Sequence, residues 1–520
     1  MDEKSRSIQL RKWHYVLIAL LTLAVVGFTI CLAILLSLSS LIEKNIRSQT
    51  FLEPGNPLFE KWTHPKYDME TRVWTFSVKN PDAILNDGKP IVKRLGPYVF
   101  DQVHKRHVHA IANQTVSYET TSHFQFNENK SCDECYLYNR VWIPNMIYQK
   151  FVEAASNPSM KAATAALLVQ TPFLEVEVSE LLFDGYADPF LDQVCSLPFV
   201  NFVCESVLDL PERIGFFYGK NGSSSGKFVV KDGHEDSNDI GQILSWEGNS
   251  ELPENWWSSP EALEIRGSDG TLFRPYLQKD KPISVFVKDL CRSVDLHFKE
   301  EVDYKGVLAY RYIVDSNAFN NALPENKGFC NNNGKIFYDE QDPKCLPSGL
   351  LDISRCQKGE PPVVLSLPHF LHAADYVVNS VEGLDKSNAE EHEIQLDLEP
   401  RLGSLFRAVR RIQINVAMWK GKNLSIPGLN LSKFHNTIVP VLMVEDYIEM
   451  DQETFDYITE KLILTERLVR TITIAGMCAA GILVILAISL WLYKHGHFKV
   501  KYAVTAPKED ATPTKVNGKF

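Results

Sequence analysis

Two long, uncharged apolar runs stand at opposite ends of the chain, and they constrain its fold more than any other feature. One run covers Val16 to Ile42 and the other covers Thr471 to Tyr493, with more than 400 residues between them. A helix needs about 20 apolar residues to cross roughly 30 Å of hydrocarbon, and both runs exceed that length. The sequence therefore predicts two membrane-spanning helices joined by one large loop.

The charges beside the two runs predict the orientation of the chain. Four Lys and Arg residues precede the first run, and Lys494, Lys499 and Lys501 follow the second. Because such charges stay on the cytoplasmic side, we expect both termini there. The first run is longer than the roughly 7 to 15 apolar residues of a cleaved signal peptide, so we expect an uncleaved anchor. The expected parts are a tail (1–15), a helix (16–42), an ectodomain (43–470), a helix (471–493) and a second tail (494–520).

The loop carries two chemical signs of the secretory pathway. Its N-x-[ST] triplets are absent from the tails, and eight of the ten cysteines also lie in it, while Cys31 and Cys478 lie inside the apolar runs. An even number of cysteines in an oxidising compartment predicts disulfides. We therefore expect a lumenal or extracellular loop with glycans on Asn113, Asn129, Asn221, Asn423 and Asn430.

The net charge of the chain is also divided between the tails and the loop. The two tails hold ten Lys and Arg residues against four Asp and Glu, so the loop side carries −17 although the whole chain carries −11. An acidic loop argues against nucleic-acid binding. With 11% aromatic residues in the chain, the loop is long enough to bury a large core as one domain or two closely packed ones.

Most of the loop has the pattern of β-strands. Apolar and polar residues alternate in Arg72–Val78, Thr115–Thr120 and Arg411–Val416, with Gly, Pro and Asn between such segments. This pattern predicts a half-buried antiparallel sheet. Residues 145–169 differ, because apolar residues and many alanines recur there at helical intervals, and Asn157-Pro158-Ser159 predicts a break into two helices. Helix packing explains the alanines; an exposed binding surface is the alternative.

The chain has no H-E-x-x-H or P-loop and no G-x-G-x-x-G between a strand and a helix, and its G-x-S-x-G match, Gly222–Gly226, is a flexible serine-rich loop and not a nucleophile elbow. Cys132-Asp-Glu-Cys135 has the spacing of a zinc half-site or a redox pair. However, zinc needs a second pair of ligands, and the redox pair needs a βαβ context. We therefore expect structural disulfides here, formed locally or with Cys195 and Cys204, and we expect no catalytic site, metal or cofactor.

A short basic patch, His104-Lys-Arg-His-Val-His109, stands out in the first third of the loop. Its cations could capture anionic ligands, and its imidazoles could sense acid pH. The alternative is an exposed edge strand that charge keeps soluble. We favour the exposed edge strand and keep capture of anions or sensing of pH as the second hypothesis.

Several short blocks, together with the two end anchors, resemble the class B scavenger receptor family. That family includes a fatty-acid translocase, a high-density-lipoprotein receptor and a lysosomal integral membrane protein. The blocks follow the family's order over nearly the whole loop: Arg94–Tyr98, Glu180–Phe190, Cys291–Ser293, Leu351–Cys356, Leu365–Phe370, Glu390–His392 with Asp397–Pro400, and Ile438–Pro440.

The resemblance implies an α+β ectodomain with a large antiparallel β-barrel-like core. A helical bundle would cap this core at an apex far from the membrane, and an apolar tunnel would run from the apex towards the bilayer. The expected helices at about residues 145–169 would form part of the cap. Such a tunnel spares a lipid the cost of exposing its chain to water, roughly 0.8 kcal/mol for each CH₂.

The implied function is a cell-surface receptor that binds lipid or lipoprotein particles at the apex and transfers lipid to the membrane. The alternative is a protein-docking or particle-engulfment receptor without lipid transport. A two-pass ectoenzyme would need a catalytic cluster that the chain does not show.

The C-terminal tail lacks lysosomal sorting motifs, which favours the plasma membrane over lysosomal or endosomal membranes. The candidate ligand-binding residues are Lys161, Phe151, His104, Arg106 and His107.

The resemblance also implies two disulfides, Cys291 with Cys356 and Cys330 with Cys345. Cys132, Cys135, Cys195 and Cys204 have no such guide; among their three possible connectivities we expect the sequence-local pairs. In the second apolar run, Ala475, Gly476, Ala479 and Ala480 form a face of small residues. We expect this face to pack on the first run, with self-association of two copies as the alternative.

Overall fold

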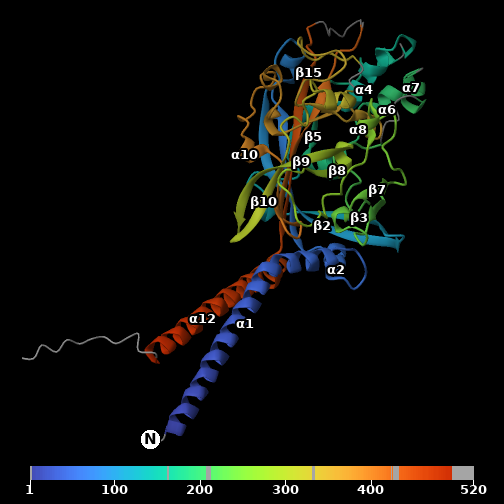
Figure 1. Ribbon diagram of the computed structural model, residues 1–520. Helices are drawn as coiled ribbons and strands as arrows, with labels where there is room; N and C mark the ends of the chain where they lie inside the picture. The colour runs from blue at the N-terminus through green and yellow to red at the C-terminus, as the bar shows by residue number, and fades with distance from the viewer. Residues whose placement is uncertain are drawn as a thin grey trace, which may run out of the picture. The chain divides into compact units, whose positions relative to one another are not determined.

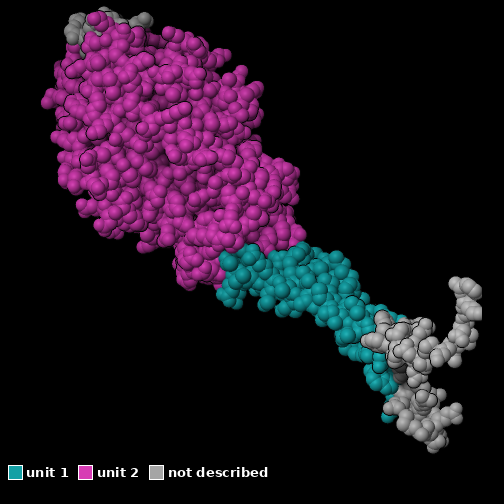
Figure 2. All heavy atoms as spheres, turned by 90° about the vertical axis from the view of Figure 1, so that its left-hand side faces the viewer, with its two compact units in different colours: residues 1–42, 458–520 teal, residues 43–457 magenta. Residues whose placement is uncertain are grey.

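A computed structural model describes residues 3–160, 163–198, 200–206, 212–330, 334–422, 424 and 433–494. The chain divides into two compact units: unit 1 contains residues 1–42 and 458–520, and unit 2 contains residues 43–457 (Figure 2). Each unit is described by itself. Lys161, Asn423 and Asn430 and the tail from residue 495 onwards lie outside the described residues.

Unit 1 holds most of two long apolar helices. The stretches Lys12–Gln49 and Gln452–Tyr493 are both long and apolar enough to cross a membrane. The two helices touch: a β-carbon on Gly476 would lie only 2.9 Å from the Sγ atom of Cys31. Arg470 also donates a hydrogen bond of 3.1 Å to Ser39. The face of small residues therefore packs within the chain, because glycine and alanine let two backbones approach closely.

The β-strands confirm the sheet that alternation predicts. All three alternating segments lie within long strands, β1, β3 and β14. The described strands are β1 (Tyr67–Val78), β2 (Val92–Ala112), β3 (Thr115–Phe126), β4 (Arg140–Pro144), β5 (Phe173–Glu177), β6 (Phe228–Lys231), β7 (Ile243–Trp246), β8 (Ile283–Val287), β9 (Arg292–Tyr304), β10 (Val307–Val314), β11 (Leu351–Asp352), β12 (Val363–Ser366), β13 (Gln395–Glu399), β14 (Ser404–Met418) and β15 (Thr437–Met450).

The helices within unit 2 are short, whereas the first and last helices of the chain, which lie mainly in unit 1, are long. The expected break at Asn157–Ser159 is confirmed, because α4 ends before it and α5 follows it. The described helices are α1 (Glu3–Gln49), α2 (Pro57–Thr63), α3 (Pro81–Ile84), α4 (Met146–Ala155), α5 (Ala163–Ala166), α6 (Leu191–Cys195), α7 (Val200–Ser206), α8 (Pro260–Leu263), α9 (Asp375–Val378), α10 (Ala389–His392), α11 (Gln452–Ile458) and α12 (Thr465–Lys494).

One antiparallel sheet dominates unit 2, with its main strands in the order β7-β6-β3-β2-β1-β15-β14-β13-β10-β9-β8 (Figure 1). The first long strand, β1, pairs with the last, β15, from Tyr67 opposite Met450 to Thr75 opposite Leu442. The α+β class is therefore confirmed. The described strand pairing leaves the sheet open, with β7 and β8 at its two edges.

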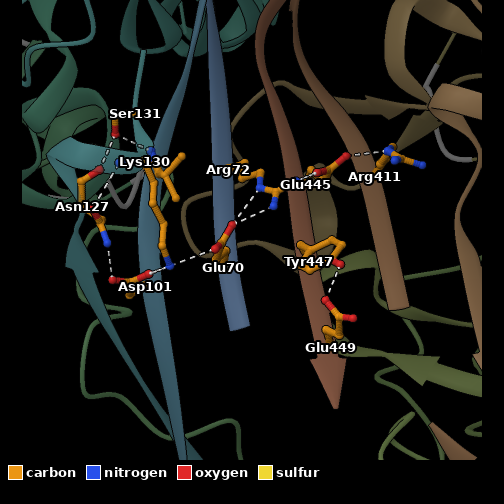
Figure 3. Close-up of polar contacts among 11 residues, drawn as sticks. Glu70, Arg72, Asp101, Asn127, Lys130, Ser131, Arg411, Glu445, Tyr447 and Glu449 are labelled. Atoms are coloured by element: carbon orange, nitrogen blue, oxygen red, sulfur yellow. Dashed lines mark hydrogen bonds and ion pairs between the residues drawn. The ribbon is translucent and has the colours of Figure 1, made fainter. Parts of the chain in front are cut away.

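Ion pairs on one face of the sheet cross from strand to strand (Figure 3). Arg72 on β1 contacts Glu70 at 2.8 Å and reaches Glu445 on β15 at 2.9 Å. Arg411 on β14 contacts the same Glu445 at 2.6 Å. Lys130 contacts Glu70 from the other side at 2.9 Å. Each such cross-strand pair contributes about 0.2–1 kcal/mol, and together these pairs favour one register. We call the face of the sheet that carries these ion pairs the outer face.

The opposite, inner face carries two apolar clusters. One cluster includes Val73 on β1, Tyr98 on β2 and Val444 on β15. A second includes Tyr312 on β10 and Ala408 on β14. Because side chains alternate along a strand, the same strands place charge on one face and apolar side chains on the other.

A two-residue segment, Gly267 and Ser268, links the two edges of the sheet. The Gly267 carbonyl accepts a hydrogen bond of 2.8 Å from the Ile243 amide on β7. Ser268 forms a bridge with Val285 on β8. A β-carbon on Gly267 would lie 1.9 Å from the Ser284 carbonyl oxygen, and the φ of Gly267 is +79°. Only glycine fits this position, since any larger residue would clash with β8.

We predict that Gly267→Ala lowers the free energy of unfolding by more than about 2 kcal/mol. The strain of a positive φ and the clash of the β-carbon with the backbone of β8 both contribute to this loss. Thermal unfolding of the full chain in lipid nanodiscs measures the loss. Gly306→Ala is the matched control, since Gly306 has a φ of +85° but no atom within 4 Å of the added β-carbon. Equal losses in the two variants would contradict the close contact at Gly267.

Candidate functional site

The helices α4, α5, α6 and α7 gather at one end of unit 2, and we call them the apical helices (Figure 1). The chain enters and leaves unit 2 at the other end. There the Lys61 ammonium on α2 lies 3.7 Å from the ring centroid of Tyr457, and Lys66 pairs with Glu453 at 2.7 Å. The apical helices are therefore the part of unit 2 furthest from both of its chain ends.

Small and apolar side chains hold the apical helices together. Ala163 and Ala166 on α5 are fully buried against Phe151 and Val152 on α4, and Val203 on α7 joins the same cluster. Helix packing thus explains the alanines, since small side chains let the helices approach closely. Phe151 is 0% exposed. It stabilises the apical core and presents no surface to a ligand, which corrects the expectation that it binds one.

A buried polar junction fixes the start of α4. The Asn145 side chain accepts a hydrogen bond from the Tyr148 amide at 3.1 Å and so caps the helix. Its amide group also donates to Gln170 at 2.9 Å and to Asp188 at 3.0 Å. Gln170 donates in turn to Asp188 at 3.1 Å. The junction ties α4 to the segments before β5 and α6, because unpaired polar groups at these buried positions would be costly.

Four disulfides join the cysteines of unit 2. The bond between Cys195 and Cys204 links α6 to α7, and the other bonds lie outside the apical helices. These are the same pairs that sequence spacing and the family resemblance led us to expect: Cys132–Cys135, Cys195–Cys204, Cys291–Cys356 and Cys330–Cys345.

The apical helices expose two large apolar side chains. Phe202 on α7 is 64% exposed, and Leu168, just after α5, is 56% exposed. Each lies beside a buried residue: Leu168 follows Leu167, and Phe202 precedes Val203. Sequence reasoning missed both residues, although an apolar side chain on the polar side of an amphipathic helix is a detectable signal. They make the apical helices a candidate docking surface for apolar or amphipathic partners.

The basic patch lies away from the apical helices, next to α2. Here β2 extends beyond β1, since pairing with β1 ends at Asp101 while pairing with β3 continues to Ala112. This part of β2 therefore has one strand neighbour, as the edge-strand alternative supposed. His107 lies exposed beside Thr121, and His109 contacts Glu119 at 3.3 Å.

His104 and Arg106 instead lie on the inner face. The Arg106 guanidinium stacks 4.4 Å from the Trp62 ring centroid and donates to the Trp62 carbonyl. Burial and the nearby cations Arg410 and Arg106 lower the pKa of His104 to about 4. The expected patch is therefore two groups that face opposite ways, because successive residues of a strand alternate.

The described glycosylation triplets lie at the surface of unit 2. Asn113, Asn129 and Asn221 are all exposed. The Asn221 amide also accepts a hydrogen bond of 3.1 Å from the Phe124 backbone. Within the described residues, no group of three or more His, Cys, Asp or Glu side chains is placed to hold a metal ion.

A buried histidine pair lies in a block that sequence reasoning used only for the resemblance. His369 is 1% exposed, and its Nδ1 atom is buried without a partner among the described residues. Its ring lies 4.8 Å from the His392 ring, and Arg94 approaches its Nε2 atom at 3.4 Å. Burial, His392 and Arg94 together lower the pKa of His369 to about 4. The pair is therefore neutral at pH 7.

Comparison with known proteins gives a consistent result. The sequence profile described as "CD36 family" matches residues 19–491. Lysosome membrane protein 2 of Rattus norvegicus is 29% identical over 418 residues, covering 79% of this chain and 81% of that protein. Scavenger receptor class B member 1 of Cricetulus griseus is 26% identical over 464 residues, covering 87% and 85%.

We predict that acidification destabilises unit 2 through His369. The unfolded imidazole takes up a proton near pH 6.5 but the folded one only near pH 4, so stability is full above pH 6.5 and falls as the pH drops towards 4. The loss from this one group approaches about 3 kcal/mol. Thermal unfolding of the full chain between pH 7.5 and 4.5 measures it.

The variant His369→Asn removes the titrating ring and should flatten this pH dependence. Asparagine suits the position, because His369 has a φ of +54°. Replacing the exposed His123 by Asn is the control and should leave the pH dependence unchanged. The same slope in His369→Asn as in the native chain would contradict the prediction.

Proposed function

The chain belongs to the CD36 family, and from this premise we propose that it is a class B scavenger-type receptor. In this proposal the apical helices bind lipid or lipoprotein particles, and unit 2 transfers lipid towards the membrane along its inner face. The observation that carries the proposal is the exposure of two apolar side chains on the tightly packed apical helices: Leu168, just after α5, and Phe202 on α7, which a disulfide links to α6. A rigid apolar patch gains free energy by covering the apolar surface of a particle.

Aromatic contacts between the two edges of the sheet support a rolled sheet with an interior path. The Trp246 ring on β7 has its centroid 5.5 Å from that of the Phe286 ring on β8, and the Phe228 ring on β6 lies 6.4 Å from the same Phe286 ring. Strands at opposite ends of the strand order therefore lie close together. Together with the link at Gly267, this supports a barrel-like core with an apolar tunnel.

A protein-docking or particle-engulfment receptor is the second candidate, since the same apical patch would suit a protein partner.

The relatives include a lysosome membrane protein and a scavenger receptor, so similarity to them does not decide between the lysosomal membrane and the plasma membrane. We propose the plasma membrane, the location that the sequence analysis favours. Binding to intact cells in the experiments below also requires this placement. We also propose glycans on the exposed Asn113, Asn129 and Asn221.

The apical patch is tested by the double variant Leu168→Asp with Phe202→Asp, expressed in cells as the full chain. Binding of fluorescent lipoprotein particles to intact cells should fall at least fivefold, because two charges replace the apolar contacts. The control is Leu308→Asp on β10, where Leu308 is 48% exposed. Unchanged particle binding in the double variant, at equal surface expression, would contradict the apical site.

The lipid path is tested by Gln102→Trp, which places a bulky ring on the half-buried inner face of β2. With particles labelled separately in protein and lipid, lipid uptake per bound particle should fall at least threefold while particle binding persists. The control is Val103→Trp, because Val103 is 56% exposed on the outer face. If the two variants transfer lipid equally well, the docking receptor becomes the better account.

A further inference from the structure

A polar layer interrupts the apolar inner face of the sheet. On β14, Arg410 lies on the same face as Ala408 and Ile412, which pack in two different apolar clusters. On β15, Asp446 lies directly opposite Arg410 in the strand register, and Thr71 on β1 lies opposite Asp446. Each strand thus contributes one polar side chain at the same level. We define the polar layer as Thr71, Gln102, Arg410 and Asp446.

Hydrogen bonds join the members of the polar layer. Asp446 accepts from Thr71 at 2.8 Å and from Arg410 at 3.2 Å. Thr71 also lies 3.4 Å from the Gln102 carbonyl oxygen. These bonds engage one terminal nitrogen of the Arg410 fork. The Arg410 Nε atom is buried and has no partner within the described part of the chain.

Solvent reaches the polar layer although its neighbours are buried. The Arg410 side chain is 42% exposed and that of Asp446 is 31% exposed. On the same face, Ala408 is 2% exposed and Val444 is 7% exposed. A guanidinium cannot be this open between buried neighbours unless the inner face is hollow there. The polar layer therefore borders open space between two apolar clusters.

Two further polar side chains, Arg106 and His104, lie on the inner face of β2. The Nε atom of Arg106 and the Nε2 atom of His104 are both buried, and neither has a hydrogen-bond partner within the described residues. Burial lowers the pKa of His104, and so do the positive charges of Arg410, Arg106 and Lys288. Their combined effect on this pKa exceeds the opposite effect of the negative charge on Asp269. Asp269 already accepts a hydrogen bond of 2.7 Å from Tyr118. The local potential is therefore positive, despite the acidic loop as a whole.

This arrangement suits an anion that carries an apolar chain. A guanidinium binds the two oxygens of a carboxylate through a planar fork, and the 42% exposed Arg410 side chain uses one terminal nitrogen to bond Asp446. The apolar clusters on either side would cover a hydrocarbon chain. The layer is one residue thick along each strand, which favours a two-oxygen head group over a bulky phosphodiester.

We propose that the polar layer selects amphiphiles by head-group charge, with Arg410 as the residue that binds a long-chain carboxylate and Asp446 as the carboxylate it displaces. The proposal rests on the proposed lipid path and adds a specificity-determining site to it. A neutral amphiphile of the same length passes the layer without this contact. The layer therefore retains carboxylates more strongly than alcohols.

The test compares photoreactive oleate with photoreactive oleyl alcohol, which lacks the carboxylate. Both are incubated with the full chain in nanodiscs of neutral phospholipid, and mass spectrometry measures labelling of peptides from β1, β14 and β15. Arg410→Gln should raise the half-saturating oleate concentration at least fivefold and leave the alcohol unchanged. The control is Arg411→Gln, the next residue on the same strand, which contacts Glu445 on the outer face at 2.6 Å.

Asp446→Asn gives a second, opposite readout that misfolding cannot imitate. Removing the competing carboxylate should lower the half-saturating oleate concentration at least threefold, again without effect on the alcohol. If both amphiphiles label the strands but neither variant changes the ratio between them, the selective layer is wrong while the lipid path stands. If neither amphiphile labels these strands in the native chain, the lipid path and the layer are both overturned.

Discussion

The pairing of β1 with β15 is the constraint on which the rest of unit 2 depends. The first strand after one apolar helix lies beside the last strand before the other, in an unbroken antiparallel register from Tyr67 to Thr75. Both ends of a loop of more than 400 residues are thereby held at one end of unit 2. The other strands of the large sheet are added outwards from this central pair, while β4 and β5 form a separate two-stranded sheet, and the apical helices gather at the opposite end.

The alternation of side chains then gives the sheet two different chemistries. On the outer face, Arg72, Glu445 and Arg411 form ion pairs across three strands. On the inner face, the residues next to them in sequence are apolar or belong to the polar layer. A lipid that leaves water for such a surface avoids about 0.8 kcal/mol for each CH₂, while a charged head group needs a partner such as Arg410. In the proposed receptor, lipid capture by the apical helices and head-group selection by the polar layer therefore depend on different residues.

Local pattern predicted the anchors, the long strands and the broken helix, because each depends on neighbours in sequence. It could not predict that Phe151 is covered on all sides, since helical spacing defines a face but not what packs on it. Nor could it show that Arg106 stacks on Trp62, a contact made across a long loop. Arg410 left a readable signal, because it interrupts the apolar side of an alternating strand, but its role needs the register with Asp446.

We propose that the sheet of unit 2 rolls around its inner face and holds a lipid chain there. The most direct measurement is a crystal structure of the full chain with a dibrominated long-chain fatty acid, using the anomalous signal of bromine to locate the chain. The account predicts bromine peaks on the inner face, among the apolar clusters that flank Arg410. Bromine peaks confined to the membrane-spanning helices, with the inner face filled by side chains, would contradict it.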